Sequence, residues 1–235
     1  VHVGHGRGAV FGSVLSRLLK EAGFQVDEEY YVNDFGRQMN ILSVSLWIRY
    51  AQIFDKNIKM FNNGYQGDYL IAIAQNLKKF RSDELYEDDE EIKSLLENEN
   101  EEAEKHTDEV IDRIKSKLND EFSYVRDFAL REILELIKKD LLEFGVDHNN
   151  WFSESTLYKS EPHDLSKVDQ SIDELSSKGF VYEKEGAIWF KSSELGDDKD
   201  RVLKRGNGEF TYFASDVAYH LDKYDRGYDR IINIW

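Results

Sequence analysis

The sequence predicts an α/β fold: part of a parallel-sheet domain, interrupted by a mainly helical insertion with small β-hairpins. Near each end of the chain, a helical pattern is followed by a strand-like segment, as in one half of a β-α-β unit. Between these ends, long stretches with helical periodicity give way to short segments that alternate with period two. A sheet domain with an insertion accounts for all these patterns.

The first elements are a helix and a strand. Apolar residues recur at helical spacing over residues 7–22, and Gly23 supplies a stop signal. The stretch FQVDEEYYVND is rich in aromatic and β-branched residues and predicts a strand that ends at Val32. Because the helix begins so early, we expect the first strand of the unit to precede Val1 and the chain to be a piece of a larger domain.

The central segment reads as helical. QMNILSVSLWIRYAQIF and GDYLIAIAQNLKKF predict two helices that bury faces against each other. The acidic residues 81–109 predict a solvated helix or a mobile loop. Residues 110–145 predict one or two amphipathic helices that end at Gly145, and residues 166–179 predict a short helix.

The last third changes to period two. Two hairpins are predicted, with turns at Glu185-Gly186 and Asn207-Gly208. SDVAYHLDKYDRG then predicts a helix with Ser215 as its N-cap, and DRIINIW predicts an apolar strand over residues 229–235. We therefore assign residues 1–39 and 200–235 to the parallel-sheet domain and residues 40–199 to the insertion.

Composition excludes several classes of protein. The chain has no cysteine, which excludes a disulfide framework and a thiolate metal site and fits a cytoplasmic location. We find no signal peptide and no apolar run long enough to span a membrane. The net charge of −16 argues against a nucleic-acid binder. However, residues 81–120 hold 16 acidic and 6 basic side chains, so net charge says little about other surfaces.

The opening HVGHGRG has the features of a phosphate site. A helix N-terminus offers unpaired N–H groups and a positive dipole end. Gly4 and Gly6 allow close approach of a phosphate, and His2 and His5 add hydrogen-bond donors. The alternative is a pair of ordinary surface or capping histidines among flexible glycines.

Two later motifs place polar residues beside predicted strands and helices. In YYVNDFGRQ, Asn33, Asp34 and Gln38 follow a strand, where ligands of parallel sheets bind; the alternative is a turn with an Asx cap at Asp34. In FTYFASDVAYH, Tyr212 and Asp216 lie four residues apart. Asp216 either interacts with the helix dipole or binds a guanidinium through a bidentate fork, with Tyr212 as a second polar contact.

The other histidines have no common spacing, so we expect no metal site. They are His106, His148, His163 and His220.

These motifs together resemble one family. HVGHGRGAV resembles the HIGH signature of class I aminoacyl-tRNA synthetases, which related nucleotidylyltransferases share. EYYVNDFGRQ, NGYQGDYL and DDKDRVLKRGNGEFTYFASDVAYHLDKYDRGYDRIINIW resemble arginyl-tRNA synthetases of the bacterial type. The resemblance implies a Rossmann-like catalytic domain that ligates L-arginine to tRNA(Arg) through an arginyl-adenylate, with ATP, accompanied by Mg²⁺, as a substrate.

The resemblance also implies roles for individual residues. His2 and His5 are expected to be catalytic and, with Gly4 and Gly6, to bind ATP. The substrate-binding residues are expected to be Tyr212, Asp216, Asn33, Asp34 and Gln38. We expect a monomer that does not associate with membranes.

Several parts of the family pattern are absent from this sequence. They include the second signature loop, the anticodon-binding domain and the N-terminal tRNA-binding domain, so we expect the chain alone to be inactive. Two alternatives stay open: another class I synthetase or an H-x-G-H nucleotidylyltransferase, and a noncatalytic synthetase-like binding module.

Overall fold

The computed structural model describes residues 3–97, 102–160 and 164–234. It divides into two compact units: a helical unit of Val1–Gly6 and Phe35–Asp147, and a mixed unit of Arg7–Asp34 and His148–Trp235. The contacts thus group residues 148–199 with the outer segments. The division into a sheet domain (1–39 and 200–235) and an insertion (40–199) stays a prediction about the family's domains.

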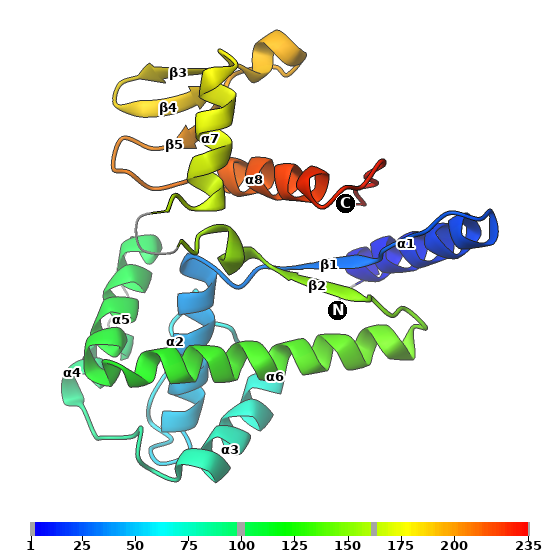
Figure 1. The fold of residues 1–235 in the computed structure, drawn as a ribbon. Helices are drawn as coiled ribbons and strands as arrows, with labels where there is room; N and C mark the ends of the chain where they lie inside the picture. The colour runs from blue at the N-terminus through cyan, green and yellow to red at the C-terminus, as the bar shows by residue number, and fades with distance from the viewer. Residues whose placement is uncertain (1–2, 98–101, 161–163, 235) are drawn as a thin grey trace. The chain divides into compact units, whose positions relative to one another are not determined.

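The helical unit is built around one central helix. Its elements are α2 (Arg37–Ala51), α3 (Tyr69–Arg81), α4 (Glu90–Glu97), α5 (Ala103–Leu118) and α6 (Glu121–Glu143). Helix α2 packs against α3, α5 and α6, and α6 crosses it in Figure 1. The predicted packing of the two apolar stretches against each other is confirmed, because they form α2 and α3.

Helix α2 is buried on nearly all sides, so its polar groups need internal partners. The Trp47 Nε1–H donates to the Leu85 carbonyl at 2.9 Å, and the Tyr50 hydroxyl donates to the Ser82 carbonyl at 2.8 Å. The Ser45 hydroxyl donates to a carbonyl of its own helix. These bonds let large aromatic side chains fill the core without leaving a polar atom unpaired.

The acidic stretch is more ordered than its composition predicts. Of the two alternatives for residues 81–109, a solvated helix or a mobile loop, the helical one is confirmed where they form α4 and the first part of α5. The helices are not solvated on all sides, because each buries part of one face in the core, including Ile92, Leu96, Val110 and Ile114. The charged residues occupy the other faces. Because charged residues dominate the composition of this segment, its apolar residues at spacings of three and four are easily overlooked in the sequence.

The described part of the mixed unit contains α1 (Val3–Glu21) from Arg7 onward, two small sheets, two further α-helices and two 3₁₀ turns. Its strands are β1 (Glu29–Val32), β2 (Asn150–Ser153), β3 (Val181–Lys184), β4 (Ala187–Phe190) and β5 (Arg201–Lys204). Its other helices are η1 (Glu154–Leu157), α7 (Lys167–Ser177), η2 (Ser192–Leu195) and α8 (Tyr212–Asp225). The first helix was predicted to begin at Arg7 but begins at Val3.

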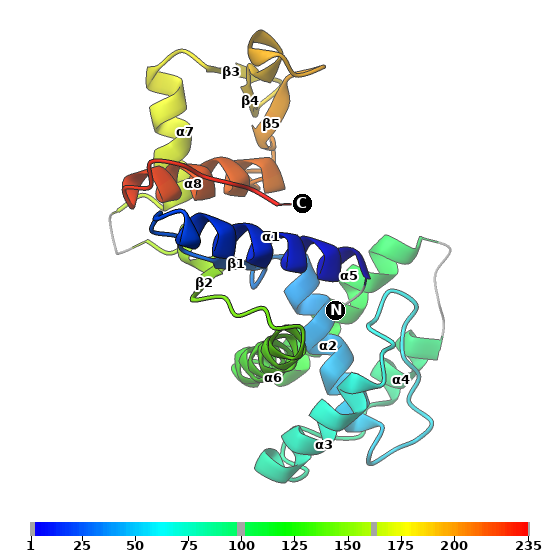
Figure 2. The same ribbon diagram turned by 90° about the vertical axis from the view of Figure 1, so that its right-hand side faces the viewer.

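Strands β1 and β2 form a parallel pair that joins segments far apart in the sequence (Figures 1 and 2). The register runs from Glu29 opposite Asn150 to Val32 opposite Ser153. Tyr31 and Phe152 stack on one face of this pair, where Tyr219 of α8 joins them. The predicted parallel sheet is therefore present, although its second strand is β2.

The other sheet is antiparallel, in the order β3-β4-β5. Its first turn is the one predicted: Glu185 and Gly186 have φ values of 54° and 74°, which the tight turn requires. The second predicted hairpin is reduced to a single bridge between Lys204 and Phe210. Helix α8 packs against α7, β5 and η1.

Two predictions near the C-terminus are wrong. Ser215 is not an N-cap, because α8 begins at Tyr212 after Thr211 and buries Ser215 inside the helix. Residues 229–234 were predicted to be a strand but pair with no strand of the described chain. A Cβ atom at Gly12 would lie 2.9 Å from Ile234, so this glycine lets the segment approach α1. An apolar composition favours a strand, but a strand forms only where a second strand is available for backbone hydrogen bonds.

No helix in the described part of the chain combines the length and the apolar character needed to cross a membrane.

We predict that Ile114→Ala lowers the free energy of unfolding by about 2–4 kcal/mol, because it leaves a cavity under α5. The matched control Glu109→Ala, on the exposed face of the same helix, should change it by less than about 0.5 kcal/mol. Urea denaturation measures both values. Equal effects would mean that the acidic helix does not pack against the core.

Candidate functional site

The site begins where the parallel strands β1 and β2 end. Parallel strands present their carboxyl ends at the same edge, which is where ligands of such sheets bind. Asp34 follows β1 after one intervening residue, and Glu154 follows β2 directly as the first residue of η1. The pairing of Val32 with Ser153 therefore brings two acidic residues, 120 positions apart in the sequence, to one edge.

Asp34 is hydrogen-bonded to the turn around Glu154. Its Oδ1 atom accepts the Ser155 backbone N–H at 2.7 Å, and its Oδ2 atom accepts the Ser153 and Ser155 hydroxyls. The residues on both sides of Glu154 are thus held by one carboxylate. These partners are distant in the sequence, so the bonds are not those of the local Asx cap that was the alternative, and substrate binding by Asp34 stays a prediction.

Glu154 is a buried carboxylate. It is 3% exposed, and its Oε2 atom has no well-formed hydrogen bond among the described residues. Burial raises the pKa of Glu154, and the nearby charges of Asp34 and Asp216 raise it further. The Ser215 and Tyr31 hydroxyls oppose this rise only in part. A buried carboxylate without a cation is costly when it is ionised, which is the physical reason that the pKa of Glu154 is raised.

Helix α8 supplies the second carboxylate. Tyr212 and Asp216 are one helical turn apart on the same face of α8. Burial raises the pKa of Asp216, while His220 and Lys223 lower it. The charge of Asp216 also raises the pKa values of Tyr31 and Glu154, and its helix α8 packs against η1, the turn that carries Glu154.

Hydroxyl groups surround the two carboxylates. Tyr158 and Ser215 share a hydrogen bond, and Tyr212 and Asp216 both act on the pKa of Tyr158. Burial and the adjacent Glu154 raise the pKa of Tyr31, so this phenol stays protonated and can donate. The result is a cluster of acceptors and phenols with a net negative charge.

Ion pairs fasten α8 to β1. The Tyr219 hydroxyl donates to Glu29 Oε1, and Arg226 forms a two-pronged ion pair with the same carboxylate at 2.7 and 3.1 Å. His220 bonds to the Asp216 carbonyl through Nδ1 at 2.8 Å, as a packing residue of this helix. These contacts hold Asp216 at the edge where Glu154 lies.

Of the H-x-G-H stretch, the described residues Gly4 and His5 lie in the first turn of α1, together with Gly6. Gly4 and His5 are exposed, and Gly6 is half-buried. His2 lies outside the described residues.

The remaining predicted residues do not join the carboxylate cluster of the mixed unit. Asn33 is exposed after β1. Gln38 belongs to the helical unit, where its side chain accepts the Tyr65 hydroxyl at 3.3 Å. Of the predicted set, the structure brings Asp34 and Asp216 near Glu154, whereas the Tyr212 side chain is 69% exposed at the start of α8.

Sequence reasoning missed Glu154, Tyr31 and Tyr158. One signal for Glu154 was available: an acidic residue two positions after the aromatic pair in NWFSES has the pattern of a polar group at a strand end. The strand itself is only four residues long and lies between two predicted helices, in a stretch to which no element was assigned.

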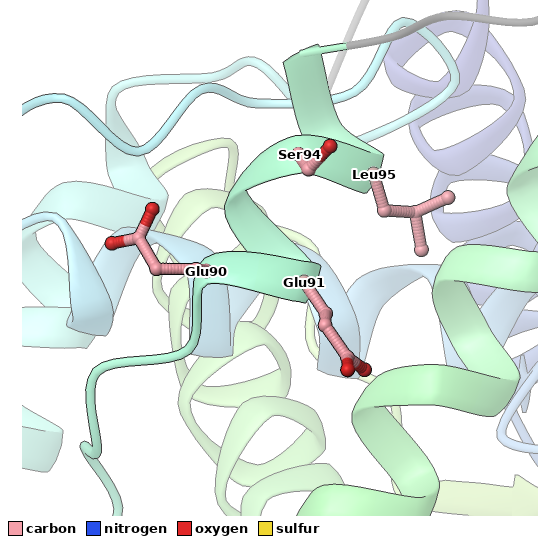
Figure 3. Close-up of a pocket in the computed structure, with 4 residues that line it drawn as sticks. All are labelled: Glu90, Glu91, Ser94 and Leu95. Carbon is pink, nitrogen blue, oxygen red and sulfur yellow. The ribbon is translucent and has the colours of Figure 1, made fainter.

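A surface depression on α4 offers no comparable arrangement. It is lined by Glu90, Glu91, Ser94 and Leu95, and the two glutamates point in different directions (Figure 3). Glu90 pairs with Lys93, and Glu91 pairs with Arg113. Across residues 3–97, 102–160 and 164–234, no three His, Cys, Asp or Glu side chains gather as metal ligands would.

Comparison with known proteins places this arrangement in a family. Residues 1–234 match the family model described as tRNA synthetases class I (R), catalytic domain. The chain is 46% identical to an arginine–tRNA ligase of Hydrogenovibrio crunogenus over 245 residues, and 43% identical to one of Acinetobacter baumannii over 251 residues. Each match covers the whole chain but only 40% and 41% of the relative.

A solved structure has the same fold. A putative arginyl-tRNA synthetase from Campylobacter jejuni superimposes with a TM-score of 0.80 at 30% identity. It is matched over all of this chain and 44% of its own length. The chain thus spans less than half of the relatives it matches, and it belongs to the catalytic-domain family of the class I arginyl-tRNA synthetases.

Proposed function

We propose that the protein containing this chain joins L-arginine to tRNA(Arg) with ATP, and that the carboxylate cluster of the mixed unit selects the arginine side chain. The names of the relatives support the reaction. One observation supports arginine as the substrate: Glu154 is buried, its Oε2 atom has no partner among the described residues, and the charge of a second carboxylate, Asp216, raises its pKa.

A guanidinium group fits this cluster better than an ammonium group. It presents five N–H donors in a planar fork, so it can bond two carboxylates and the Tyr212 hydroxyl at once. A lysine side chain carries three donors at one point and would leave part of the buried Glu154 carboxylate unpaired. Leaving a buried polar group unpaired is a strong source of discrimination.

ATP is assigned to the start of α1. The first-turn N–H groups of Gly4, His5 and Gly6, with the positive end of the helix dipole, suit phosphate oxygens. His5 and His2 would donate to the charge that develops on the α-phosphate. Mg²⁺ would arrive with the nucleotide, since we assign no residue of the described chain as its ligand.

The chemistry consists of two displacements. An oxygen of the arginine carboxylate attacks the α-phosphorus, and the bond to pyrophosphate breaks. The 3′-terminal ribose hydroxyl of the tRNA then attacks the activated carbonyl carbon, and AMP leaves. The role proposed for Glu154 and Asp216 is to fix the far end of arginine so that its carboxylate lies in line for the first step.

The remaining expectations stay predictions: a monomer, a cytoplasmic location and direct substrate contacts by Asn33 and Gln38.

Pyrophosphate exchange in the complete enzyme tests the proposed function. With tRNA(Arg) present, exchange should depend on arginine and not on lysine or other amino acids. Exchange with a different amino acid would favour another class I synthetase. Exchange without any amino acid would favour a nucleotidylyltransferase, and no exchange at all would favour a noncatalytic module.

Removing either carboxylate should weaken arginine binding selectively. Glu154→Gln and Asp216→Asn should each raise the arginine KM roughly 100-fold and leave the ATP KM nearly unchanged, because each removes one of the two charged partners of the guanidinium. Glu194→Gln is the matched control, since Glu194 lies in the exposed start of η2. Without arginine, Glu154→Gln should melt above the wild type, because it removes a buried charge. An unchanged arginine KM would refute the assignment.

Arginine binding should depend on pH through the raised pKa values of Glu154 and Asp216. As pH falls, these groups take up protons above the range of ordinary carboxyls, so the dissociation constant for arginine should rise. Stability without ligand has the opposite sign: an acid with a raised folded pKa destabilises the fold when ionised, and that cost disappears on protonation. Calorimetric titrations from about pH 8 to about pH 5 test this. A flat profile would contradict it, and Glu154→Gln should flatten it.

A further inference from the structure

The charge of Asp34 destabilises the ionised form of Glu154, because it raises the pKa of Glu154. A second acid beside a buried carboxylate needs a compensating role. Its hydrogen bonds indicate that role, since they go to the residues on either side of Glu154 and not to Glu154 itself.

The segment that carries Glu154 is short, and its start lacks a capping bond of its own. Helix η1 is a single 3₁₀ turn of four residues, and the side chain of its N-cap, Ser153, makes no capping bond. The Ser155 N–H at its start has no earlier carbonyl to bond, as at any helix N-terminus. Asp34 supplies that acceptor at 2.7 Å and also binds the two serine hydroxyls, which lie 3.0 Å apart.

We propose that Asp34 is a positioning residue: it holds the Ser153–Ser155 turn so that Glu154 stays beside Asp216, and it does not itself contact arginine. This inference rests on the proposed arginine site and revises the prediction that Asp34 binds substrate. Repulsion between Glu154 and Asp216 would otherwise drive the two carboxylates apart. The Asp34 carboxylate resists this with three bonds to a charged acceptor, which are stronger than bonds to a neutral one.

The chain contains a matched control for this arrangement. Asp200 accepts the Ser193 N–H at 3.1 Å and the Ser193 hydroxyl at 2.6 Å, at the start of the other 3₁₀ turn, η2. The acidic residue in that turn, Glu194, is exposed. Asp200→Asn therefore perturbs the same kind of turn without displacing a buried carboxylate.

The test is a double-mutant cycle in the complete enzyme. Asp34→Asn should raise the arginine KM about tenfold, with kcat and the ATP KM within about twofold of the wild type. In the Glu154→Gln background the same substitution should change the arginine KM by less than about twofold, because nothing charged remains to be positioned. Thermal melting of each variant confirms folding, and Asp200→Asn should leave the arginine KM unchanged.

Each contrary outcome overturns a different statement. A tenfold effect of Asp34→Asn that persists with Glu154→Gln means that Asp34 contacts arginine directly or acts independently, which overturns the positioning role. Equal effects of Asp34→Asn and Asp200→Asn on the arginine KM would show a general loss of structure, which overturns it too. An unchanged arginine KM in Glu154→Gln alone overturns the arginine site itself.

Discussion

The parallel pairing of β1 with β2 is the constraint on which the candidate site depends. Four residues on each side bring the end of the first strand next to the start of η1. Without this register, Asp34 would not reach Ser153 and Ser155, and Glu154 would not lie next to the end of β1. The anchoring of α8 to Glu29 of β1 then adds Asp216 to the same edge. A short piece of sheet thus organises residues from three distant segments.

The acidic residues of this chain form two physically different populations, which the net charge of −16 combines. On the helical unit they are exposed and paired: the Arg81 guanidinium, for example, lowers the pKa of Glu121. In the carboxylate cluster, burial raises the pKa values of Glu154 and Asp216. The direction of the shift separates exposed, paired carboxylates from buried ones.

The sequence predicted elements that carry a local signal. The stripe of α3, the turn at Glu185-Gly186 and the stop at Gly145 follow from periodicity and backbone preference, and all are confirmed. It missed β2, because NWFS is too short to show alternation and its partner lies 121 residues away. Tyr212 and Asp216 were identified through a resemblance, whereas Glu154 becomes apparent only through its burial. Ser215 was wrongly assigned as an N-cap, because a serine in the first turn of a helix has the same sequence signal as a serine at its start.

The insertion of the helical unit between two paired strands has a consequence for folding. Closing a loop of some 120 residues by four strand pairs has an entropic cost that grows with the logarithm of loop length. The helices of residues 35–147 belong to one compact unit, so they can pack on one another before the strands pair. Their packing would shorten the effective loop that the strand pair has to close. We therefore expect the helices to form before the strand pair, so that the candidate site is completed only when β1 and β2 have paired.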